Sequence, residues 1–440
     1  MMVWLMLLGA IAGVGQPSSR EDRWREDIAV ARSDFLAKDL SFTPDRRRAA
    51  ERRLDELASN IASLTDQETV AELARVAALA DNPHTRAYLL RNRGWWRRYP
   101  IRIWKFSDGW RVIAARPEHQ RLLGARIVAF GTRPVAAAEA AVRPLYAGPA
   151  TWGAYMASYT LTSPDALLGT RVIAGDGTVE LKVEKDGGRL TAALAPVEEP
   201  RRTIPEESWW FLSPAHSATK GWAHVLAGRS LPSYLDRPGK WYELRRCEGG
   251  VLYLGFNRAE DQPGELTLSA FGAAVLDQIR QAPDARLVID LRFNTGGNLQ
   301  KTTGLFRSIA ASRVGQTERR LFVILGPSTF SAGITPAAIL KESSKAVIVG
   351  SEPGDRLRFW AEGGNVLLPN SGINLHFADR VHVYSGEAPG VSEKLVYLTL
   401  NGRSLRPDLP APTRFADYLA GRDPATERIL PDGLRCSEPD

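Results

Sequence analysis

The hydrophobic positions in the N-terminal part of the chain recur at helical spacing. Between Thr43 and Ala80, apolar residues follow one another at three- to four-residue steps, which is the period of one buried helix face. Pro44 suits the first position of a helix. The segment Thr65-Asp66-Gln67-Glu68 is a capping-box signature that opens a second helix. We therefore predict two antiparallel helices in this part of the chain.

The hydrophobic pattern then changes to short runs rich in β-branched and aromatic residues. Such runs, bounded by turn residues, are typical of strands. They occupy Arg102 to Phe106, Trp110 to Ala114 and Arg126 to Phe130. Two further runs, Val179 to Val183 and Arg189 to Leu194, are separated by a glycine-containing turn and predict a hairpin.

From about residue 250 onward, strand-like and helix-like segments alternate. The expected strands are Val251 to Phe256, Arg286 to Leu291, Leu321 to Leu325 and Ala346 to Val349, and the expected helices are Thr267 to Ala282, Thr302 to Ser312 and Thr335 to Glu342. Alternation of this kind predicts an α/β layered domain with a largely parallel sheet. Chemistry in such sheets collects beyond the carboxyl ends of the strands, where loops 255–257, 292–298 and 326–333 follow.

Composition places the chain among ordinary globular proteins. Its 440 residues are 44% hydrophobic and 24% charged, which excludes disorder and a polytopic membrane protein. The length predicts two or three domains. The formal net charge of +7 is small and dispersed, so no nucleic-acid partner is expected.

The first residues indicate export. Met2 to Val14 are nearly all apolar, and small residues precede the polar segment after Gln16. This stretch is shorter than a membrane span requires, so we predict a signal peptide over 1–16, with a buried N-terminal helix as the alternative. We expect no stable membrane span. The two cysteines, Cys247 and Cys436, could pair after export, but their separation leaves this open.

Two of the strand-end loops carry candidate chemistry. Ser331 lies where a strand gives way to a helix, so its hydroxyl could attack a carbonyl near free backbone N–H groups, or it could simply cap the helix. Gly296 and Gly297 could present amide protons to a ligand, or they could form only a tight turn.

Taken together, the motifs resemble the S41 peptidases, the tail-specific or C-terminal-processing protease family. The segments that carry this resemblance are Leu287 to Asn298 (LVIDLRFNTGGN), Gly326 to Gly333 (GPSTFSAG), Ala346 to Asp355 (AVIVGSEPGD), Leu367 to Gly372 and Ala416 to Pro424. The resemblance implies hydrolysis of peptide bonds by a serine nucleophile, with no cofactor and no metal. A polypeptide is the implied substrate.

The same resemblance suggests a domain organisation. It implies a crotonase/ClpP-like α/β catalytic domain over 241–430 and a β-rich PDZ-like domain over 99–198, where Leu123 to Gly131 looks like a PDZ segment. We further expect an N-terminal helical region over 24–98 and a connector over 199–240.

The chain departs from the lysine branch of this family. Where that branch has its base lysine, this sequence has Arg356, which stays protonated and cannot accept a proton. Lys301, Lys341 or Lys345 could substitute only if the fold brought one of them to the serine.

A histidine branch of the family offers another base. His84, in Asp81-Asn82-Pro83-His84-Thr85, resembles the "D-x-H-T" stretch of S41-like hydrolases that lack the lysine, and a neutral imidazole can accept a proton near pH 7. The resemblance implies an orienting glutamate beyond the nucleophile. Glu387 is the first choice, and Glu393 and Glu362 are alternatives.

The catalytic hypothesis thus combines Ser331 as nucleophile, His84 as base and Glu387 as orienting carboxylate. The oxyanion hole would consist of the N–H of Ala332 with that of Gly297 or Gly296. The protein would be periplasmic or secreted, and the oligomeric state is left open.

Two other functions remain open from the sequence. An inactive S41-like scaffold could capture peptides by strand addition. An acyl-CoA enzyme on the crotonase fold is a weaker alternative, because CoA chemistry belongs inside the cell.

Overall fold

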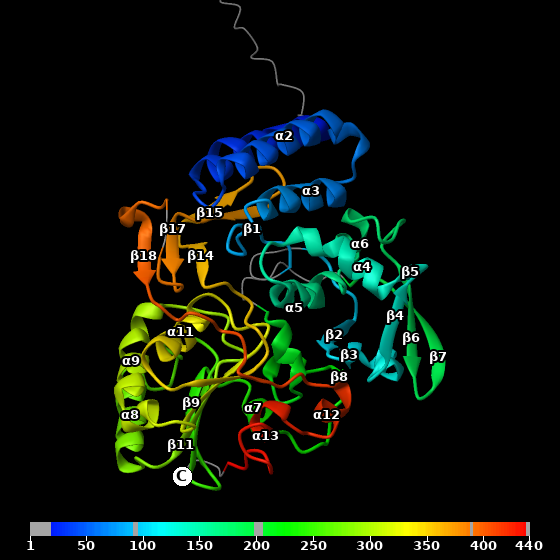
Figure 1. The fold of residues 1–440 in the computed structure, drawn as a ribbon. Helices are drawn as coiled ribbons and strands as arrows, with labels where there is room; N and C mark the ends of the chain where they lie inside the picture. Colours follow the sequence, from blue (N-terminus) through cyan, green and yellow to red (C-terminus); the bar gives the residue numbers. More distant parts are fainter. Residues whose placement is uncertain (1–18, 91–95, 198–205, 388–389, 437–440) are drawn as a thin grey trace, which may run out of the picture.

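The structure is a computed structural model that describes residues 19–90, 96–197, 206–387 and 390–436. The expected signal peptide over 1–16 lies outside these residues. Figure 1 shows the N-terminal helices in blue at the top, a small sheet in cyan and green on the right, and a larger layered unit at the lower left. None of the described helices combines the length and apolar character needed to cross a bilayer.

The N-terminal helices form as the spacing of apolar residues predicts. α1 (Arg20–Val30) continues into a π-helical turn, and α2 (Pro44–Asn60) and α3 (Asp66–Ala78) follow. The Thr43 side chain accepts a hydrogen bond from the backbone of Arg46, and the capping box at the start of α3 is present. The expectation of two helices between Thr43 and Ala80 is confirmed.

A sheet with strand order β2-β3-β4-β6-β7 follows. Its strands are β2 (Ile101–Phe106), β3 (Gly109–Ala115), β4 (Arg126–Phe130), β6 (Val179–Lys185) and β7 (Gly188–Leu194), with the short β5 (Arg133–Pro134) beside β4. All pairings within it are antiparallel, so the predicted strands and hairpin are confirmed.

Between β5 and β6 the chain forms three helices that the sequence did not reveal: α4 (Val135–Val142), α5 (Ala150–Thr160) and α6 (Pro164–Gly169). Most of α5 is buried, including Trp152, Tyr155 and Tyr159. A helix enclosed on several sides has no polar face and so shows no amphipathic period.

The larger unit is built on a six-stranded sheet with strand order β19-β13-β12-β11-β10-β9. Its strands are β9 (Tyr242–Cys247), β10 (Val251–Phe256), β11 (Arg286–Asp290), β12 (Leu321–Leu325), β13 (Val347–Gly350) and β19 (Leu409–Pro410). All neighbours are parallel except β9 and β10. The largely parallel α/β sheet is therefore confirmed, with two additional edge strands.

Helices cover one face of this sheet. They are α8 (Leu268–Gln281), α9 (Thr303–Ala311) and α11 (Thr335–Ser343), which pack on alternate strand residues such as Leu287 and Val323. The intervening strand residues form a second apolar cluster on the opposite face, as the two-residue period of a strand requires. The remaining short helices are α7 (Ser233–Asp236), α10 (Arg313–Gln316), α12 (Phe415–Leu419) and α13 (Pro424–Glu427).

Two small sheets join the larger unit to the N-terminal region. One contains β14 (Arg358–Ala361), β17 (Arg380–Val383) and β18 (Val396–Thr399). In the other, β1 (Arg86–Ala87) pairs with β16 (Asn374–Phe377), which pairs with β15 (Gly364–Leu367). Because β1 begins two residues after His84, this pairing fixes an N-terminal loop against the C-terminal half of the chain.

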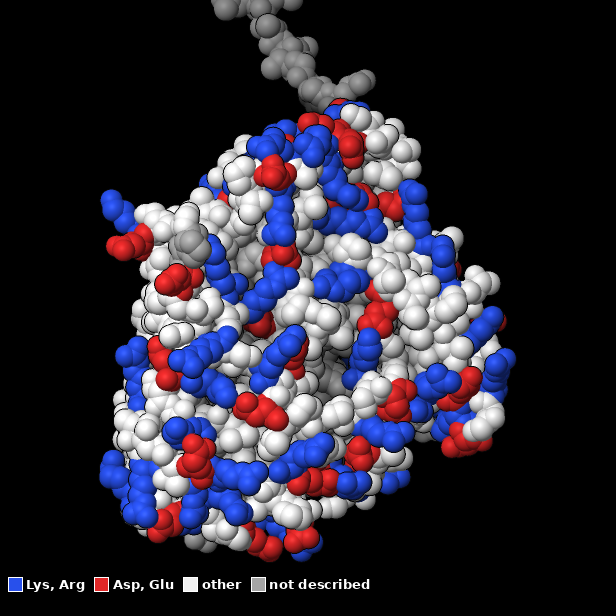
Figure 2. All heavy atoms as spheres, viewed as in Figure 1, with Lys and Arg blue, Asp and Glu red and all other residues white. Residues whose placement is uncertain are grey.

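The described part of the expected connector, from Glu206 to Lys240, packs into the fold. Trp209, Phe211 and Leu212 are buried, and β8 (Ala223–His224) pairs with β3. The PDZ-like and crotonase/ClpP-like domains and the domain limits given above stay predictions. Figure 2 shows Lys and Arg side chains interspersed with Asp and Glu side chains over the face in view.

Cys247 and Cys436 form a disulfide between residues 189 positions apart. Closing so long a loop restricts the unfolded chain, which raises the free energy of unfolding. Replacing both cysteines with serine should therefore lower that free energy by about 2–5 kcal/mol. Denaturant unfolding of the oxidised wild type and the double variant measures this difference, and equal midpoints and slopes would contradict it.

Candidate active site

Asn294 connects, through hydrogen bonds, the three loops that follow β10, β11 and β12. This residue is fully buried. Its Nδ2 donates to Phe256 O at 2.9 Å, and its backbone oxygen accepts from Phe330 N at 2.9 Å. Ser328 and Thr329 add bonds from their hydroxyls to Arg292 O and Leu291 O. The carboxyl ends of three neighbouring strands thus form one connected surface.

Ser331 has an unusual backbone at this surface. Its φ is +57°, a left-handed conformation that non-glycine residues rarely adopt and that costs of order 1–3 kcal/mol. Its backbone N–H donates to Asp355 Oδ2 at 3.2 Å. A buried carboxylate therefore holds the serine in a strained position at the start of the turn that contains Ala332.

Loop 292–298, which contains Gly296 and Gly297 and is called the glycine loop below, lies directly against Ser331. A Cβ added at Gly296 would lie 2.9 Å from Ser331 Cβ and 3.3 Å from its Oγ, so a side chain there would crowd the serine. The Gly296 N–H donates to Asn294 Oδ1 at 3.0 Å. For the Gly297 N–H, no hydrogen bond is found within the described residues, and Gly297 is exposed.

His84 lies beside the same carboxylate. Its Nε2 is 3.1 Å from Asp355 Oδ2, so one oxygen connects the imidazole to the Ser331 backbone. The ring stacks between Phe330 (4.5 Å between centroids) and Phe359 (5.3 Å). The sequence hypothesis placed His84 with Ser331, and the structure brings the two residues into the same site.

Two hydrogen bonds expected of a catalytic serine and histidine are not found among the described residues. The Ser331 hydroxyl and the His84 ring make no hydrogen bond with each other in this structure, and no partner of His84 Nδ1 is found among the described residues. In unliganded enzymes, catalytic hydrogen bonds are often long and tighten only when substrate binds.

Asp355 was not singled out by sequence reasoning. Its side chain has no exposed surface, and its Oδ1 accepts from the backbone N–H of Arg356 at 2.9 Å. Asp355 directly precedes Arg356, which stands where the lysine branch of the S41 family has its base. Only Arg356 was considered at this place in the sequence, although its neighbour was an equally visible candidate.

Arg356 anchors the loop that carries His84. Its guanidinium donates to the backbone oxygen and to Oδ1 of Asp81, both at 2.8 Å. Nearby, Asn82 Oδ1 accepts from Trp360 N at 3.2 Å. The residue at the lysine position therefore connects the His84 loop with the Asp355 loop.

The three lysines considered as substitutes form ion pairs elsewhere. Lys341 pairs with Asp408, and Lys345 with Glu318. Lys301 pairs with Glu260 and Asp261, and hydrogen bonds from its ammonium to these carboxylates raise its pKa. A lysine held in the charged form is a poor proton acceptor.

Among the described residues, no hydrogen bond or ion pair joins a candidate glutamate to the His84 ring. Glu387 is exposed, and no hydrogen bond or ion pair of its carboxylate is found among the described residues; Glu393 is also exposed. Glu362 instead lies 3.1 Å from His382 Nε2, and that hydrogen bond lowers the pKa of Glu362. The carboxylate that contacts His84 is Asp355.

Burial lowers the pKa of four of the histidines. It lowers the pKa of His84 despite the opposing effect of Asp355, lowers that of His224, and brings His216 to about 4 and His376 to about 3. His84 is therefore neutral at pH 7, which is the form that accepts a proton.

These low pKa values predict acid sensitivity of the fold. Below about pH 6.5 the unfolded chain binds protons that these four histidines of the folded chain do not bind. The free energy of unfolding should fall as pH decreases, by up to about 1.4 kcal/mol per pH unit for each histidine. Glu243, whose pKa burial raises to about 7, offsets part of this effect.

Denaturant unfolding at pH 7.5, 6.5 and 5.5 measures the slope. The variant His216→Asn keeps an acceptor for the Ala218 N–H, with which His216 Nδ1 bonds, but removes the titrating group. Its slope should be smaller by about one proton. Equal stability of the wild type at pH 7.5 and 5.5 would contradict the assignment of these four histidines as neutral.

An apolar cavity of about 360 Å³ borders the first residues of loop 326–333. Trp104, Tyr155, Phe293 and Pro327 are among its lining residues, whereas Ser331 and His84 are not. The cavity is therefore separate from the candidate reacting groups. Within the described residues, no group of His, Cys, Asp or Glu is arranged to hold a metal ion.

Comparison with known proteins identifies the fold. No protein-family model and no curated sequence matches the chain. Among solved structures, a CPAF mutant matches with a TM-score of 0.59 and 14% identity, covering 93% of this chain and 96% of that chain. Mature CPAF complexed with lactacystin matches with a TM-score of 0.57 and 12% identity, covering 93% and 97%.

Tricorn protease matches less closely, with a TM-score of 0.36 and 12% identity, covering 94% of this chain and 37% of that chain. The chain is a mixed α/β protein with the fold of S41-type peptidases. The resemblance seen in the sequence motifs is thus confirmed at the level of the fold.

Proposed function

We propose that this chain is an exported serine-type peptidase in which Ser331 is the nucleophile, His84 the general base and Asp355 the orienting carboxylate. The observation that carries the proposal is the shared oxygen of Asp355, which lies 3.1 Å from His84 Nε2 and accepts from Ser331 N at 3.2 Å. Asp355 replaces Glu387 because it is buried and contacts the imidazole, whereas Glu387 does neither.

The proposed reaction follows the acyl-enzyme route. Asp355 keeps the proton of His84 on Nε2, so the lone pair on Nδ1 accepts the proton of Ser331 as its Oγ attacks the peptide carbonyl. His84 then gives this proton to the leaving amine, and water releases the acyl group. Asp355 stabilises the imidazolium that forms in between.

Backbone amides would stabilise the negative charge on the tetrahedral intermediate. We propose the N–H groups of Ala332 and Gly297 for this role, since the Gly296 N–H already donates to Asn294. In acyl transfer, two such donors supply a large part of the rate enhancement.

Export is supported by two independent features. The apolar N-terminal segment is typical of a signal peptide, and a disulfide between Cys247 and Cys436 is stable in an oxidising compartment. We propose a periplasmic or secreted location.

A second candidate function is peptide binding without hydrolysis. The observation that favours it is the missing hydrogen bond between the Ser331 hydroxyl and the His84 ring. In that case the scaffold would hold an extended peptide without attacking it.

Incubating the purified chain with an unstructured polypeptide such as casein separates the two functions. We expect new amino termini to accumulate, and we expect pretreatment with a fluorophosphonate to stop their formation. Binding of the polypeptide without new amino termini would support the second function and contradict the first.

A further inference from the structure

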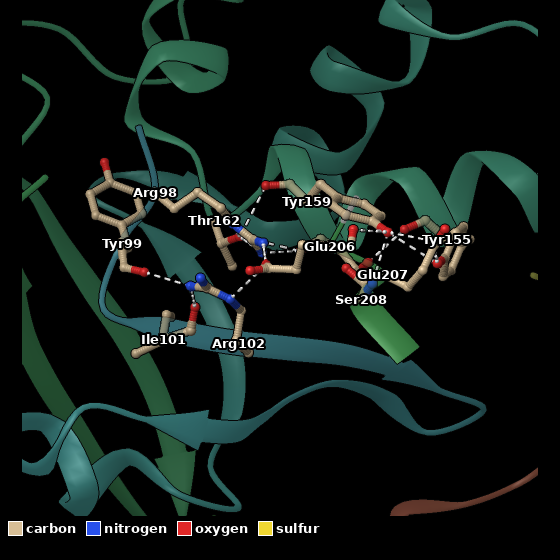
Figure 3. A network of polar contacts seen from close by, with 11 residues as sticks. Arg98, Tyr99, Ile101, Arg102, Tyr155, Tyr159, Thr162, Glu206, Glu207 and Ser208 are labelled. Atoms are coloured by element: carbon tan, nitrogen blue, oxygen red, sulfur yellow. Dashed lines mark hydrogen bonds and ion pairs between the residues drawn. The ribbon is translucent and has the colours of Figure 1, made fainter. Parts of the chain in front are cut away.

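The side chains of two consecutive buried glutamates, Glu206 and Glu207, contact different residues of one polar network (Figure 3), and the Tyr159 hydroxyl bonds both residues. Glu206 forms ion pairs with Arg98 at 2.6 Å and Arg102 at 3.4 Å. Figure 3 shows Glu206 directed toward these arginines, while Glu207 lies on the side of Tyr155. The two carboxylates therefore serve different parts of the fold.

Glu207 links helix α5 to the glycine loop. Its Oε2 accepts from the hydroxyls of Tyr155 at 2.7 Å and Tyr159 at 3.2 Å, and its Oε1 accepts from Thr295 Oγ1 at 3.2 Å. Thr295 directly precedes Gly296 and Gly297. Only 3% of the Glu207 surface is exposed, so these hydrogen bonds form in an environment where they are strong.

Backbone hydrogen bonds hold one side of the glycine loop, since Ala259 N donates to Gly296 O at 3.0 Å and Asn298 N donates to Ala259 O at 2.7 Å. Gly296 and Gly297 both have positive φ, at +112° and +135°, and glycine gives the backbone wide conformational freedom. An oxyanion donor acts only if its N–H is held at hydrogen-bond distance from the developing charge. Asn294 fixes the loop on one side, and Thr295 is the next residue that a side-chain contact holds.

The same helix also contacts the nucleophile side of the site. Trp152 of α5 stacks on Phe330, with 4.0 Å between centroids, and Trp152 also contacts Tyr155 at 5.4 Å. Phe330 directly precedes Ser331. Helix α5 thus contacts Phe330, the residue before the nucleophile, directly. Through Glu207 it is also connected to Thr295, the residue before the glycine pair.

We propose that Glu207 is a positioning residue of this site: through Thr295 it orders the loop that presents the Gly297 N–H. The inference rests on the proposed function, because it assigns that amide to the oxyanion hole. Because Glu207 is almost fully buried, it would act on the loop through Thr295 and not on the substrate directly.

The variant Thr295→Val tests the link with little change in side-chain shape. We expect the rate of fluorophosphonate labelling, and kcat for peptide hydrolysis, to fall about ten- to a hundredfold, with KM nearly unchanged. Thr295→Ser keeps the hydroxyl and should restore most of the rate. The matched control is Thr162→Val, since the Thr162 hydroxyl accepts from Arg98 on the Glu206 side of the network; it should leave the labelling rate unchanged.

A double-mutant comparison shows whether Glu207 acts through Thr295. Glu207→Ala should slow labelling to a similar extent, and the variant with both substitutions should be no slower than the worse single variant. Rates that multiply would overturn the proposed route through Thr295.

Hydrogen exchange separates failure of this inference from failure of the proposed function. Amides of residues 294–298 should exchange faster in Thr295→Val and Glu207→Ala than in the wild type. If the fluorophosphonate does not label the wild type but exchange is faster in both variants, the peptidase assignment is wrong. The conclusion that Glu207 orders the loop through Thr295 would then still hold. Unchanged exchange, or an unchanged labelling rate in a reactive protein, would overturn the role of Glu207.

Discussion

Replacing Ser331 with alanine is expected to lower the rate of polypeptide hydrolysis by at least about 10⁴-fold. The substitution removes the only atom that can form the acyl-enzyme in the proposed mechanism, and what remains is the smaller effect of the oxyanion donors and of substrate binding. The backbone of the variant should be unchanged, because the N–H that donates to Asp355 is kept.

The control for this variant is Ser328→Ala, in the same loop. The Ser328 hydroxyl donates to Arg292 O at 2.7 Å, so its loss should lower the free energy of unfolding by about 1 kcal/mol while hydrolysis continues. Hydrolysis by Ser331→Ala at more than a tenth of the wild-type rate would exclude Ser331 as the nucleophile.

Replacing His84 with alanine is expected to lower kcat by about 10⁴-fold. Without the imidazole the serine hydroxyl has no proton acceptor, and the Asp355 carboxylate, now missing one donor, remains buried beside it. Affinity for the polypeptide should change little, because the ring lies between Phe330 and Phe359. Rates of hydrolysis and of binding, measured separately, distinguish these effects.

Arg356→Ala provides the comparison for His84→Ala. Arg356 holds the His84 loop through Asp81 but contributes no proton acceptor, so its loss should cost about tenfold in kcat, as expected of a displaced catalytic group. A larger loss in Arg356→Ala than in His84→Ala would show that the base is not His84.

The strands of the central sheet could be predicted because each lies within one short apolar run. β10 and β12 match the expected ranges, and β11 and β13 differ by one residue at their ends. β9 was missed because only two of the five residues before its cysteine are apolar or aromatic, as YELRRC shows. Edge strands carry less apolar sequence, since one side of the strand has no partner.

The candidate site was predictable only where its residues share a local motif. Ser331 and the glycine pair each lie in a strand-end loop, so the sheet topology alone brings them together. Asp355 meets His84 across 271 positions of sequence, and that contact depends on β1 pairing with β16 and on Arg356 bonding Asp81. Spacing along a single chain carries no signal for such a pairing.

The most direct test of the central claim identifies the residue that a fluorophosphonate modifies. The intact, folded chain is treated with the probe, digested and sequenced by mass spectrometry. The account predicts one adduct, on Ser331, and a reaction rate that drops with His84→Ala. An adduct on another residue, or hydrolysis of polypeptide by a chain that the probe never modifies, would contradict it.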